Sequence, residues 1–322
     1  MPSQIRYAEP HDYAAITRIH NDQNEPDHHT TPERQRQADE RSAARDPAFR
    51  RLVADVGGEV VATGSFRSSW AGEFRPGKFW ILVHVREDHR QAGIDVRILD
   101  KARRGTDSPV DEVWTCVRED LVPAAGFIAG ERFEERFRSW GSHLDVASFD
   151  PDRLAATGHR LEREGIRLVG YHYLTDPGLA GDAKLDAKLD AKLVNLQRAL
   201  EEDVLAFEPI IPRRHPDVTD TETILDATLV AVGPDDSYVG ITSLTGDPKS
   251  KQLGCGFTGV LPAYRNRGIA TALMCRAAAI AKVYGCEDLN AGGGGVDTPM
   301  LGVLRKVGFD IEPAWVTFSK RY

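Results

Sequence analysis

Hydrophobic and polar positions along the first half of the chain predict strands and helices in alternation. Residues 51–66 read RLVADVGGEVVATGSF, in which two β-branched runs flank Gly57-Gly58. A glycine pair supplies the positive φ angles of a tight turn, so a β-hairpin is expected here. Residues 79–85, FWILVHV, form a continuous apolar run, which is typical of a central strand buried on both faces. Further segments complete this half, namely strands at 5–7 and 112–117, helices at 12–21, 92–104 and 123–130, and a strand pair within 134–144.

The second half repeats the same order of elements. The pattern predicts strands at 165–174 and 253–261, a hairpin from 227–232 and 238–245, a long helix at 268–284, then a strand at 288–290, a helix at 299–307 and a strand at 315–319. A chain of 322 residues suits two domains of roughly 150 residues each. Because Pro151 interrupts the chain between the two series, we expect domains at 1–152 and 153–322, with 151–165 as either a linker or a helix.

One low-complexity segment lies between the elements of the second half. Residues 182–193 read DAKLDAKLDAKL, and the four-residue repeat places its leucines on one side of a helix. Leu196 and Leu200 continue that stripe. The stripe spans too few turns for a coiled-coil zipper, so we expect an amphipathic helix that packs on the sheet through its leucines.

Composition and charge narrow the function classes. The chain has 41 Lys and Arg against 49 Asp and Glu, a formal net charge of −8, which argues against a nucleic-acid partner. The start of the sequence lacks the pattern of a signal peptide, and no run of about 18 apolar residues predicts a membrane span. The four cysteines form no Cys-x-x-Cys pair, so we expect reduced thiols, no metal site and a cytoplasmic protein. We expect a monomer or a homodimer.

A passage of the first half recurs in the second. Residues 85–98, VREDHRQAGIDVRI, align with residues 260–273, VLPAYRNRGIATAL, at a constant offset of 175 positions. The alignment places Arg90 on Arg265 and Gly93 on Gly268. Each copy follows a predicted buried strand and opens a predicted helix, where unpaired backbone N–H groups and the helix dipole favour a phosphate.

The second copy has the residues that such a phosphate site needs. In RNRGIA, residues 265–270, Gly268 permits close approach to the backbone and Ala270 keeps the next turn small. Arg265 and Arg267 add cationic side chains. The passage therefore predicts a pyrophosphate-binding loop.

The second copy resembles the acyl-CoA signature of the GNAT acyltransferases, Gln/Arg-x-x-Gly-x-Gly/Ala after a strand that ends in Val-x-Pro. The residues that match are Val260, Pro262, Arg265, Gly268 and Ala270. Residues 299–309, PMLGVLRKVGF, resemble the closing helix of that family with its Gly-Phe ending, and 127–140 is similar in the first half. The resemblance implies an α/β (α+β) fold of two tandem GNAT-like domains, each a mixed, mostly antiparallel twisted sheet flanked by helices.

The resemblance also implies an activity and a site. We expect an acyl-CoA-dependent N-acyltransferase that transfers an acetyl group from acetyl-CoA to a small-molecule or peptide amine, with a non-catalytic CoA-binding or regulatory protein as the alternative. The implied CoA-binding residues are Thr258, Gly259, Val260, Arg265, Asn266, Arg267, Gly268, Ile269, Ala270, Thr271 and Asn290.

The first copy departs from this pattern at the helix start. Asp95 stands where the second copy has Ala270, and Arg86-Glu87 replaces Leu261-Pro262. A carboxylate in the first turn can satisfy the helix's own N–H groups and repels a pyrophosphate. We therefore expect a degenerate first domain that keeps its fold without catalysis.

The second copy departs from the family at its closing helix. Leu304 occupies the position where many GNAT enzymes have a Tyr that acts as general acid, so the general acid and base stay unassigned. Tyr264 and Tyr284 are substitutes for the acid, and the carboxylates considered as bases are Asp220, Glu222 and Asp247. We expect Cys255 to be a packed strand residue and 291–297, AGGGGVD, to be a flexible loop, because it lacks the ending of a P-loop.

Overall fold

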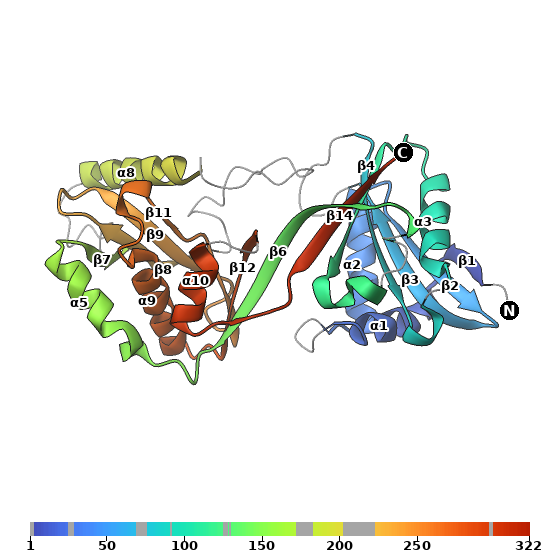
Figure 1. Cartoon of the computed structure of the whole chain (residues 1–322), viewed down its shortest axis with the longest axis horizontal. Coiled ribbons are helices and arrows are strands. Elements are labelled where there is room, and N and C mark those ends of the chain that lie inside the picture. Colours follow the sequence, from blue (N-terminus) through green and yellow to red (C-terminus); the bar gives the residue numbers. More distant parts are fainter. Residues whose placement is uncertain are drawn as a thin grey trace. The chain divides into compact units, whose positions relative to one another are not determined.

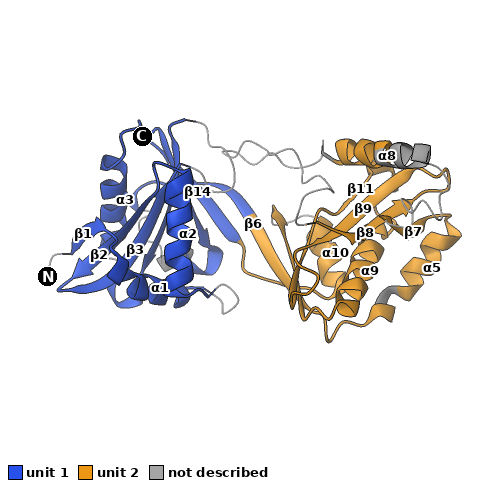
Figure 2. Cartoon of the chain, turned by 180° about the vertical axis from the view of Figure 1, so that it is seen from behind, with its two compact units in different colours: residues 1–138, 207–212, 315–322 blue, residues 139–206, 213–314 orange. Residues whose placement is uncertain are grey.

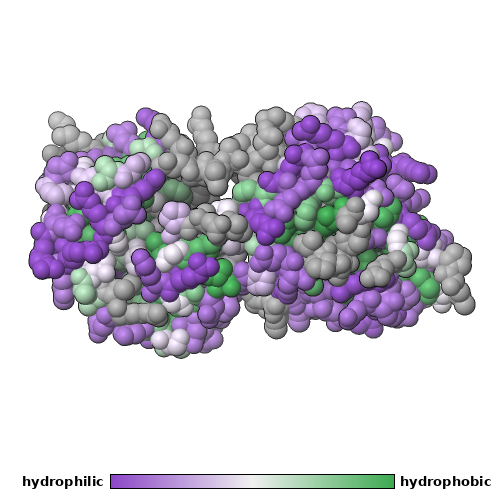
Figure 3. Space-filling model, viewed as in Figure 1, coloured by the Kyte–Doolittle hydropathy of each residue, from purple (hydrophilic) through white to green (hydrophobic). Residues whose placement is uncertain are grey.

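The computed structural model describes residues 3–24, 29–68, 76–90, 92–124, 128, 130–171, 183–201, 223–295 and 299–322. It divides into two compact units, and the last strand of the chain belongs to the first of them (Figures 1 and 2). The described residues of unit 1 come from 3–138 and 315–322, and those of unit 2 from 139–201 and 223–314. On the face that Figure 3 shows, hydrophilic residues predominate on the surface of each unit.

Unit 1 is a sheet with helices on both faces. Its elements are β1 (Gln4–Tyr7), α1 (Tyr13–Asn21), α2 (Pro32–Arg45), β2 (Arg50–Val56), β3 (Glu59–Arg67), β4 (Lys78–Val85), α3 (Ile94–Arg104), β5 (Glu112–Arg118), the start of β6 (Glu134–Asp145) and β14 (Trp315–Arg321). The strand order is β1-β2-β3-β4-β5-β14-β6, and every printed pair in it is antiparallel except β4 with β5. Apolar residues of α3 pack on one face with Leu52 and Ala54, whereas Ile16 and Ile19 of α1 pack on the other face with Val53.

Unit 2 repeats this architecture. Its elements are the second part of β6, α5 (Ala155–Arg163), β7 (Arg167–Gly170), α8 (Ala183–Glu201), β8 (Thr223–Val232), β9 (Tyr238–Thr245), β10 (Gln252–Cys255), β11 (Gly259–Val260), α9 (Ile269–Val283), β12 (Asp288–Gly294), α10 (Pro299–Val307) and β13 (Asp310–Ile311). The strand order is β6-β12-β10-β9-β8-β7, with β11 also on β9 and β13 also on β6. The two mixed, mostly antiparallel sheets confirm the predicted fold class.

Helix α8 contains the repeated DAKL segment and covers one face of the second sheet (Figure 1). Leu193, Leu196 and Leu200 are buried against Val230 and Val232 of β8 and neighbouring residues of β9. The alternate β8 residues pack on the opposite face, with α9 and α10. The prediction that the leucine stripe packs on the sheet is therefore confirmed for these three residues, and the side chains of 183–190 lie outside the description.

The two units use equivalent strands in exchanged positions. Trp140 of β6 and Trp315 of β14 are 175 residues apart, the offset of the repeated passage. Nevertheless β14, at the end of the chain, pairs with β5 in unit 1 from Trp315↔Arg118 to Arg321↔Glu112. Residues 139–145 of β6 pair with β12 in unit 2. Each unit is therefore completed by a strand from the other half of the sequence.

Three predicted segments differ from the structure. The strand pair expected within 134–144 is one strand of 12 residues, β6, because it continues from one unit into the next. The strand expected at 253–261 is interrupted between β10 and β11. The flexible loop expected at 291–297 is wrong for 291–294, which are strand residues of β12; a Cβ on Gly293 would lie 2.6 Å from the Trp140 ring, so glycine there permits close packing.

Candidate functional site

At their described turn and glycine positions, the two copies of the repeated passage adopt matching backbone conformations. In each, a 3₁₀ turn (η3, Glu87–His89, and η6, Pro262–Tyr264) leads to a glycine that begins the following helix. Gly93 has φ 67° and ψ 19°, and Gly268 has φ 85° and ψ 8°. Both lie in the left-handed region that favours glycine. The backbone hydrogen bonds also correspond, including Arg90 N–H to Glu87 O and Arg265 N–H to Pro262 O, both 3.2 Å.

The arginine shared by the two copies fixes the loop to the preceding strand. Arg265 Nε donates to the carbonyl oxygen of Val260 at 3.0 Å, and Arg90 Nε donates to that of Val85 at 3.3 Å. The signature arginine thus closes the turn between strand and helix in both units, whatever its other nitrogens bind.

The first turn of the helix is where the copies differ. In α3 the carboxylate of Asp95 accepts a hydrogen bond from the Val96 N–H at 2.9 Å, so the acid serves one of the helix's own first-turn donors. In α9 no acidic residue lies in the first turn. The dipole and the first N–H groups of α9 are therefore not offset by a local carboxylate.

The glycine of the second copy lies beneath residues of α5. A Cβ on Gly268 would come within 2.9 Å of Thr157 Cγ2 and 3.0 Å of Arg160 Nη2, whereas a Cβ on Gly93 would meet nothing within 4 Å. Arg160 Nη2 also donates to the carbonyl oxygen of Arg267 at 2.6 Å. Residues of α5 thus lie against the start of α9, and Arg160 brings a guanidinium to a helix start whose backbone N–H groups favour a phosphate.

The remaining residues of the loop have distinct surroundings. Asn266 has φ 63°, a left-handed conformation that asparagine tolerates better than most residues. The Arg267 guanidinium lies 5.1 Å from the centre of the Tyr264 ring and is exposed. Ile269 and Thr271 are buried in the unit, and Ala270 is half-buried against the core. The loop thus exposes Asn266 and Arg267 while Ile269 and Thr271 hold the helix in place.

A β-bulge precedes the loop. Cys255 pairs with Leu244 and Gly259 pairs with Ile241, so three residues, 256–258, lie opposite two of β9. Such a bulge leaves backbone groups without ladder partners and redirects the strand. Of its donors, the Gly256 N–H reaches the Ser243 carbonyl at 2.8 Å. The bulge therefore lies directly before the predicted Gly259 and Val260, which pair with β9, and includes the predicted Thr258.

The two central parallel strands separate beyond the bulge. Parallel pairing between β10 and β12 runs from Gln252↔Asp288 to Gly254↔Asn290, after which the chain bends into β11 while β12 continues along β6. Asn290 is thus the last β12 residue paired with β10, at the point where the strands diverge. The Thr258 hydroxyl, in the bulge, lies 2.7 Å from the Thr242 hydroxyl and 3.4 Å from Met274 Sδ.

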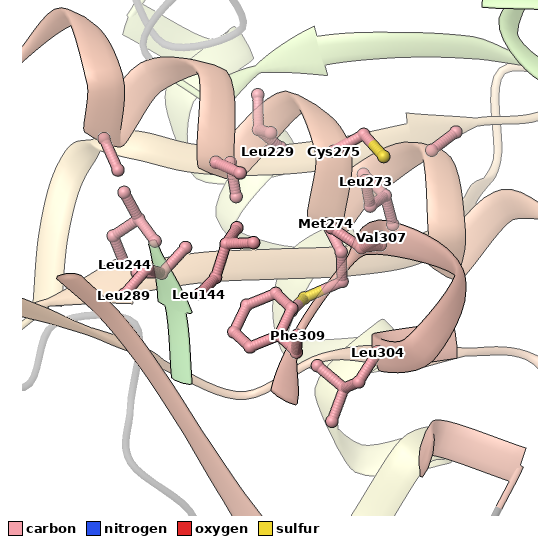
Figure 4. Close-up of a cluster of buried hydrophobic side chains, with 14 of the residues drawn as sticks. Leu144, Leu229, Leu244, Leu273, Met274, Cys275, Leu289, Leu304, Val307 and Phe309 are labelled. Carbon is pink, nitrogen blue, oxygen red and sulfur yellow. The ribbon is translucent and has the colours of Figure 1, made fainter. Parts of the chain in front are cut away.

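Leu304, at the position of the expected general acid, lies in the core. Its exposed fraction is 0%, and it belongs to the cluster with Met274 and Phe309 that Figure 4 shows. A tyrosine in its place would have to displace that packing. Tyr284 lies at the C-terminal end of α9, about 24 Å along the helix from Gly268, so it is too distant to serve the same site.

The other candidate side chains have structural surroundings or lie outside the described residues. Asp247 accepts from the Lys249 N–H at 2.9 Å within a turn. Asp220 and Glu222 are outside the described residues. Burial raises the pKa of the Cys255 thiol to about 12, so the thiolate is disfavoured and the expectation of a packed strand cysteine is confirmed. Within the described part of the chain, no group of three His, Cys, Asp or Glu residues is arranged to hold a metal.

Sequence reasoning missed the two residues that cover Gly268. Thr157 and Arg160 are more than 100 positions away along the chain, and no local pattern singles them out. They reach the loop because α5 packs beside the start of α9 within unit 2. Arg160 therefore joins Arg265 and Arg267 as the third guanidinium near this helix start.

Comparisons with known proteins agree with this architecture. Residues 196–309 match the model of the acetyltransferase (GNAT) family. Over 100% of this chain and 96% of the other, the structure is similar to a GCN5-related N-acetyltransferase from Sphaerobacter thermophilus, with a TM-score of 0.65 and 19% identity. A tandem GNAT protein from the clavulanic acid biosynthesis pathway has a TM-score of 0.53 and 15% identity over 99% of this chain and 98% of its own. No curated protein sequence matches the chain.

The fold and the bulge-loop-helix site thus define a tandem GNAT-like architecture that extends over the whole chain. Within it, residues 196–309 are a domain of the acetyltransferase (GNAT) family, as the resemblance of the second repeated passage implied. No helix of the described residues is long and apolar enough to cross a membrane.

Proposed function

We propose that unit 2 is an acyl-CoA-dependent N-acyltransferase that acts on a small-molecule or peptide amine, with acetyl-CoA as the expected donor, while unit 1 is structural. The observation that carries the proposal is the start of α9, where no first-turn acid competes for the N–H groups and the Arg160 guanidinium lies against the backbone of Arg267 and Gly268. The family assignment of 196–309 supports the same reaction class.

In this proposal each segment has one task. The diphosphate of CoA accepts hydrogen bonds from the backbone between Arg265 and Thr271, and Arg160 and Arg267 contribute charge at the rim. The bulge at 256–258 and the start of β11 direct backbone N–H groups towards the place where negative charge develops on the acyl oxygen. The acyl-CoA supplies an activated acyl group as a thioester. The protein then holds the amine and the carbonyl carbon in reacting geometry.

A second candidate function rests on Leu304. Because that buried side chain cannot donate a proton, the protein could be a CoA-binding or regulatory protein without turnover. The two functions differ in what happens after CoA binds. They are separated by release of the CoA thiol from acetyl-CoA in the presence of a panel of amines.

The test uses the full chain and a matched pair of glycine variants. Amine-dependent thiol release supports the transferase, and saturable binding of acetyl-CoA without thiol release on any amine supports the alternative. Gly268→Ala should weaken CoA binding about tenfold or more, because a Cβ there would lie 2.9 Å from Thr157 Cγ2 and 3.0 Å from Arg160 Nη2, so that α5 or the loop would have to shift.

Gly93→Ala is the control for backbone strain. It introduces a methyl group at a similar positive φ, where nothing lies within 4 Å, so it should cost the backbone strain alone and leave CoA binding unchanged. Equal loss of CoA binding in both variants would exclude the start of α9 as the site.

A further inference from the structure

A cleft in unit 1 has no role in the proposed transferase. It has a volume of about 500 Å³ and opens where β14 lies between β5 and β6. Volumes of this size are typical of sites for small molecules. The charged side chains that line it are Arg132, Arg136, Lys320 and Arg321, together with the carboxylates Glu131 and Glu134.

The two carboxylates of the lining are each engaged by a cation. Lys320 pairs with Glu131, and Arg136 Nη2 lies 3.0 Å from Glu134 Oε2. Arg321 Nε lies 3.7 Å from a buried carboxylate behind the cleft, that of Glu112. Glu112 in turn already has Lys78 at 3.1 Å. Positive charge therefore exceeds negative charge in the lining.

Among the cationic side chains of the lining, Arg132 differs from the others. No carboxylate of the described residues lies within 4 Å of its guanidinium. It lies at the end of a helical turn, where the Phe133 N–H donates to the Ile128 carbonyl at 3.1 Å. The corresponding helix of unit 2 ends in the same way, with the Phe309 N–H donating to the Leu304 carbonyl at 3.0 Å.

The two helix ends differ in the residue before the phenylalanine. Unit 2 has Gly308 there, with φ 113°, whereas unit 1 has Arg132, with φ 57°. A left-handed conformation at the end of a helix favours glycine, because a Cβ clashes with the backbone there. Arginine at this strained position brings a guanidinium to the cleft, and such outliers concentrate at functional sites.

We propose that this cleft binds a small dianionic oxyanion, such as the phosphate group of a phosphate monoester, between the guanidiniums of Arg132 and Arg321. The planar guanidinium forms paired hydrogen bonds with phosphate oxygens, and two such groups match a double negative charge. Arg136, at the same cleft, adds a third guanidinium on the wall. This proposal is independent of the proposed transferase function.

The test is calorimetric titration of the full chain with inorganic phosphate, in a phosphate-free buffer about one unit above the second phosphate pKa of about 6. Saturable binding of one phosphate per chain is expected. Arg132→Gly should weaken binding about tenfold or more by removing charge-assisted hydrogen bonds. It should not lower the melting temperature, because glycine adopts the positive φ of this position without strain.

Two further variants distinguish phosphate binding in this cleft from non-specific attraction of phosphate to positive charge. Arg132→Lys keeps a positive charge and should retain part of the affinity, whereas Arg104→Gln, an exposed α3 residue outside the cleft, should leave binding unchanged. Unaltered phosphate affinity in Arg132→Gly, or equal losses in Arg132→Gly and Arg104→Gln, would overturn the proposal. Tighter binding of the probe succinate than of phosphate would overturn the assignment to a phosphate group.

Discussion

The two repeated passages share a backbone and differ in their chemistry. From η3 to the first turn of α3, and from η6 to the first turn of α9, the dihedral angles of the glycine and the backbone hydrogen bonds correspond. Three first-turn residues then differ, Asp95, Val96 and Arg97 against Ala270, Thr271 and Ala272, and Asp95 is the one acid among them. The comparison teaches that arginine and glycine set the shape of the loop, and we propose that the acid at Asp95 disfavours an anion at the start of α3.

The two units also share strands. β6 begins in unit 1 and continues into unit 2, whereas β14, from the end of the second half of the sequence, belongs to unit 1. Residues 139–145 complete unit 2 beside β12, and 315–321 complete unit 1 beside β5. A strand edge left unpaired exposes backbone groups, so neither unit is complete without the exchange.

The largest effect is expected from separating the halves at the sequence boundary between 152 and 153. A fragment 153–322 lacks the seven residues of β6 that pair with β12, so its sheet ends in an unpaired strand. We expect it to show no cooperative thermal unfolding by circular dichroism. A fragment 139–314, which keeps the strand and omits β14, should unfold cooperatively.

One result would contradict this prediction about the two fragments. If 153–322 unfolds as sharply as 139–314 and at the same temperature, residues 139–145 are dispensable for unit 2. The units would then be domains with the boundary that the sequence predicts, and the exchange would contribute little to stability.

The next largest effect is expected from transferring the first-turn residue between copies. Ala270→Asp should weaken CoA binding about 100-fold, since two unit charges about 4 Å apart repel by roughly 1 kcal/mol in water and 4 kcal/mol at an effective dielectric constant of 20. Calorimetric titration with CoA measures the change. Ala270→Asn, which has nearly the same shape without the charge, is the matched control and should lose much less affinity.

The reciprocal variant tests unit 1. Asp95→Ala removes the carboxylate that accepts from the Val96 N–H, so phosphate groups could approach the start of α3. A second, weaker CoA site should then appear in the titration. If no second site appears, charge is not what excludes CoA from unit 1, and the electrostatic explanation of its degeneracy is wrong.

Much of this fold could be predicted from sequence because its strands and helices carry apolar patterns. The hairpins and the helices α9 and α10 have such patterns and lie where they were expected. Helix α2 was missed because it lacks an apolar stripe; its buried residue is Asp39. That carboxylate accepts hydrogen bonds from Arg51 at 2.7 Å and from the Tyr13 hydroxyl at 3.0 Å, a polar contact that periodicity does not reveal.

The candidate site likewise has parts that the sequence predicts and parts that it does not. The loop around Gly268 is a local motif, so its conformation follows from the residues that compose it. The bulge at 256–258 was hidden inside an apolar run, although the glycines at 254, 256 and 259 were a signal for it. Arg160 and the strand exchange depend on which distant elements pack together, and a single sequence does not contain that information in any local pattern.

The smallest effect is expected from a Lys–Glu ion pair that occurs in both units, largely buried in unit 1 and exposed in unit 2. Lys78 and Glu112 lie 3.1 Å apart with side chains 18% and 6% exposed, whereas Lys251 and Glu287 lie 2.9 Å apart with side chains 71% and 64% exposed. Glu112 and Glu287 are separated by 175 residues, like the repeated passages. Burial alone raises the pKa of Glu112, but hydrogen bonds from Ser319 and Lys78 outweigh it, and the pKa lies below its usual value.

Because the pKa of Glu112 is lowered in the folded protein, its contribution to stability is present above the unfolded pKa of about 4.3 and is lost as the pH falls through the folded value. Glu112→Gln should therefore lower the free energy of unfolding by about 2 kcal/mol at neutral pH, measured with urea. The difference from the unaltered protein should shrink as the pH falls through the lowered pKa of Glu112 and the carboxylate becomes protonated. Glu287→Gln, at the exposed pair, should leave stability unchanged at both pH values, since solvent screens it. Equal effects of the two variants would show that depth of burial does not distinguish the pairs.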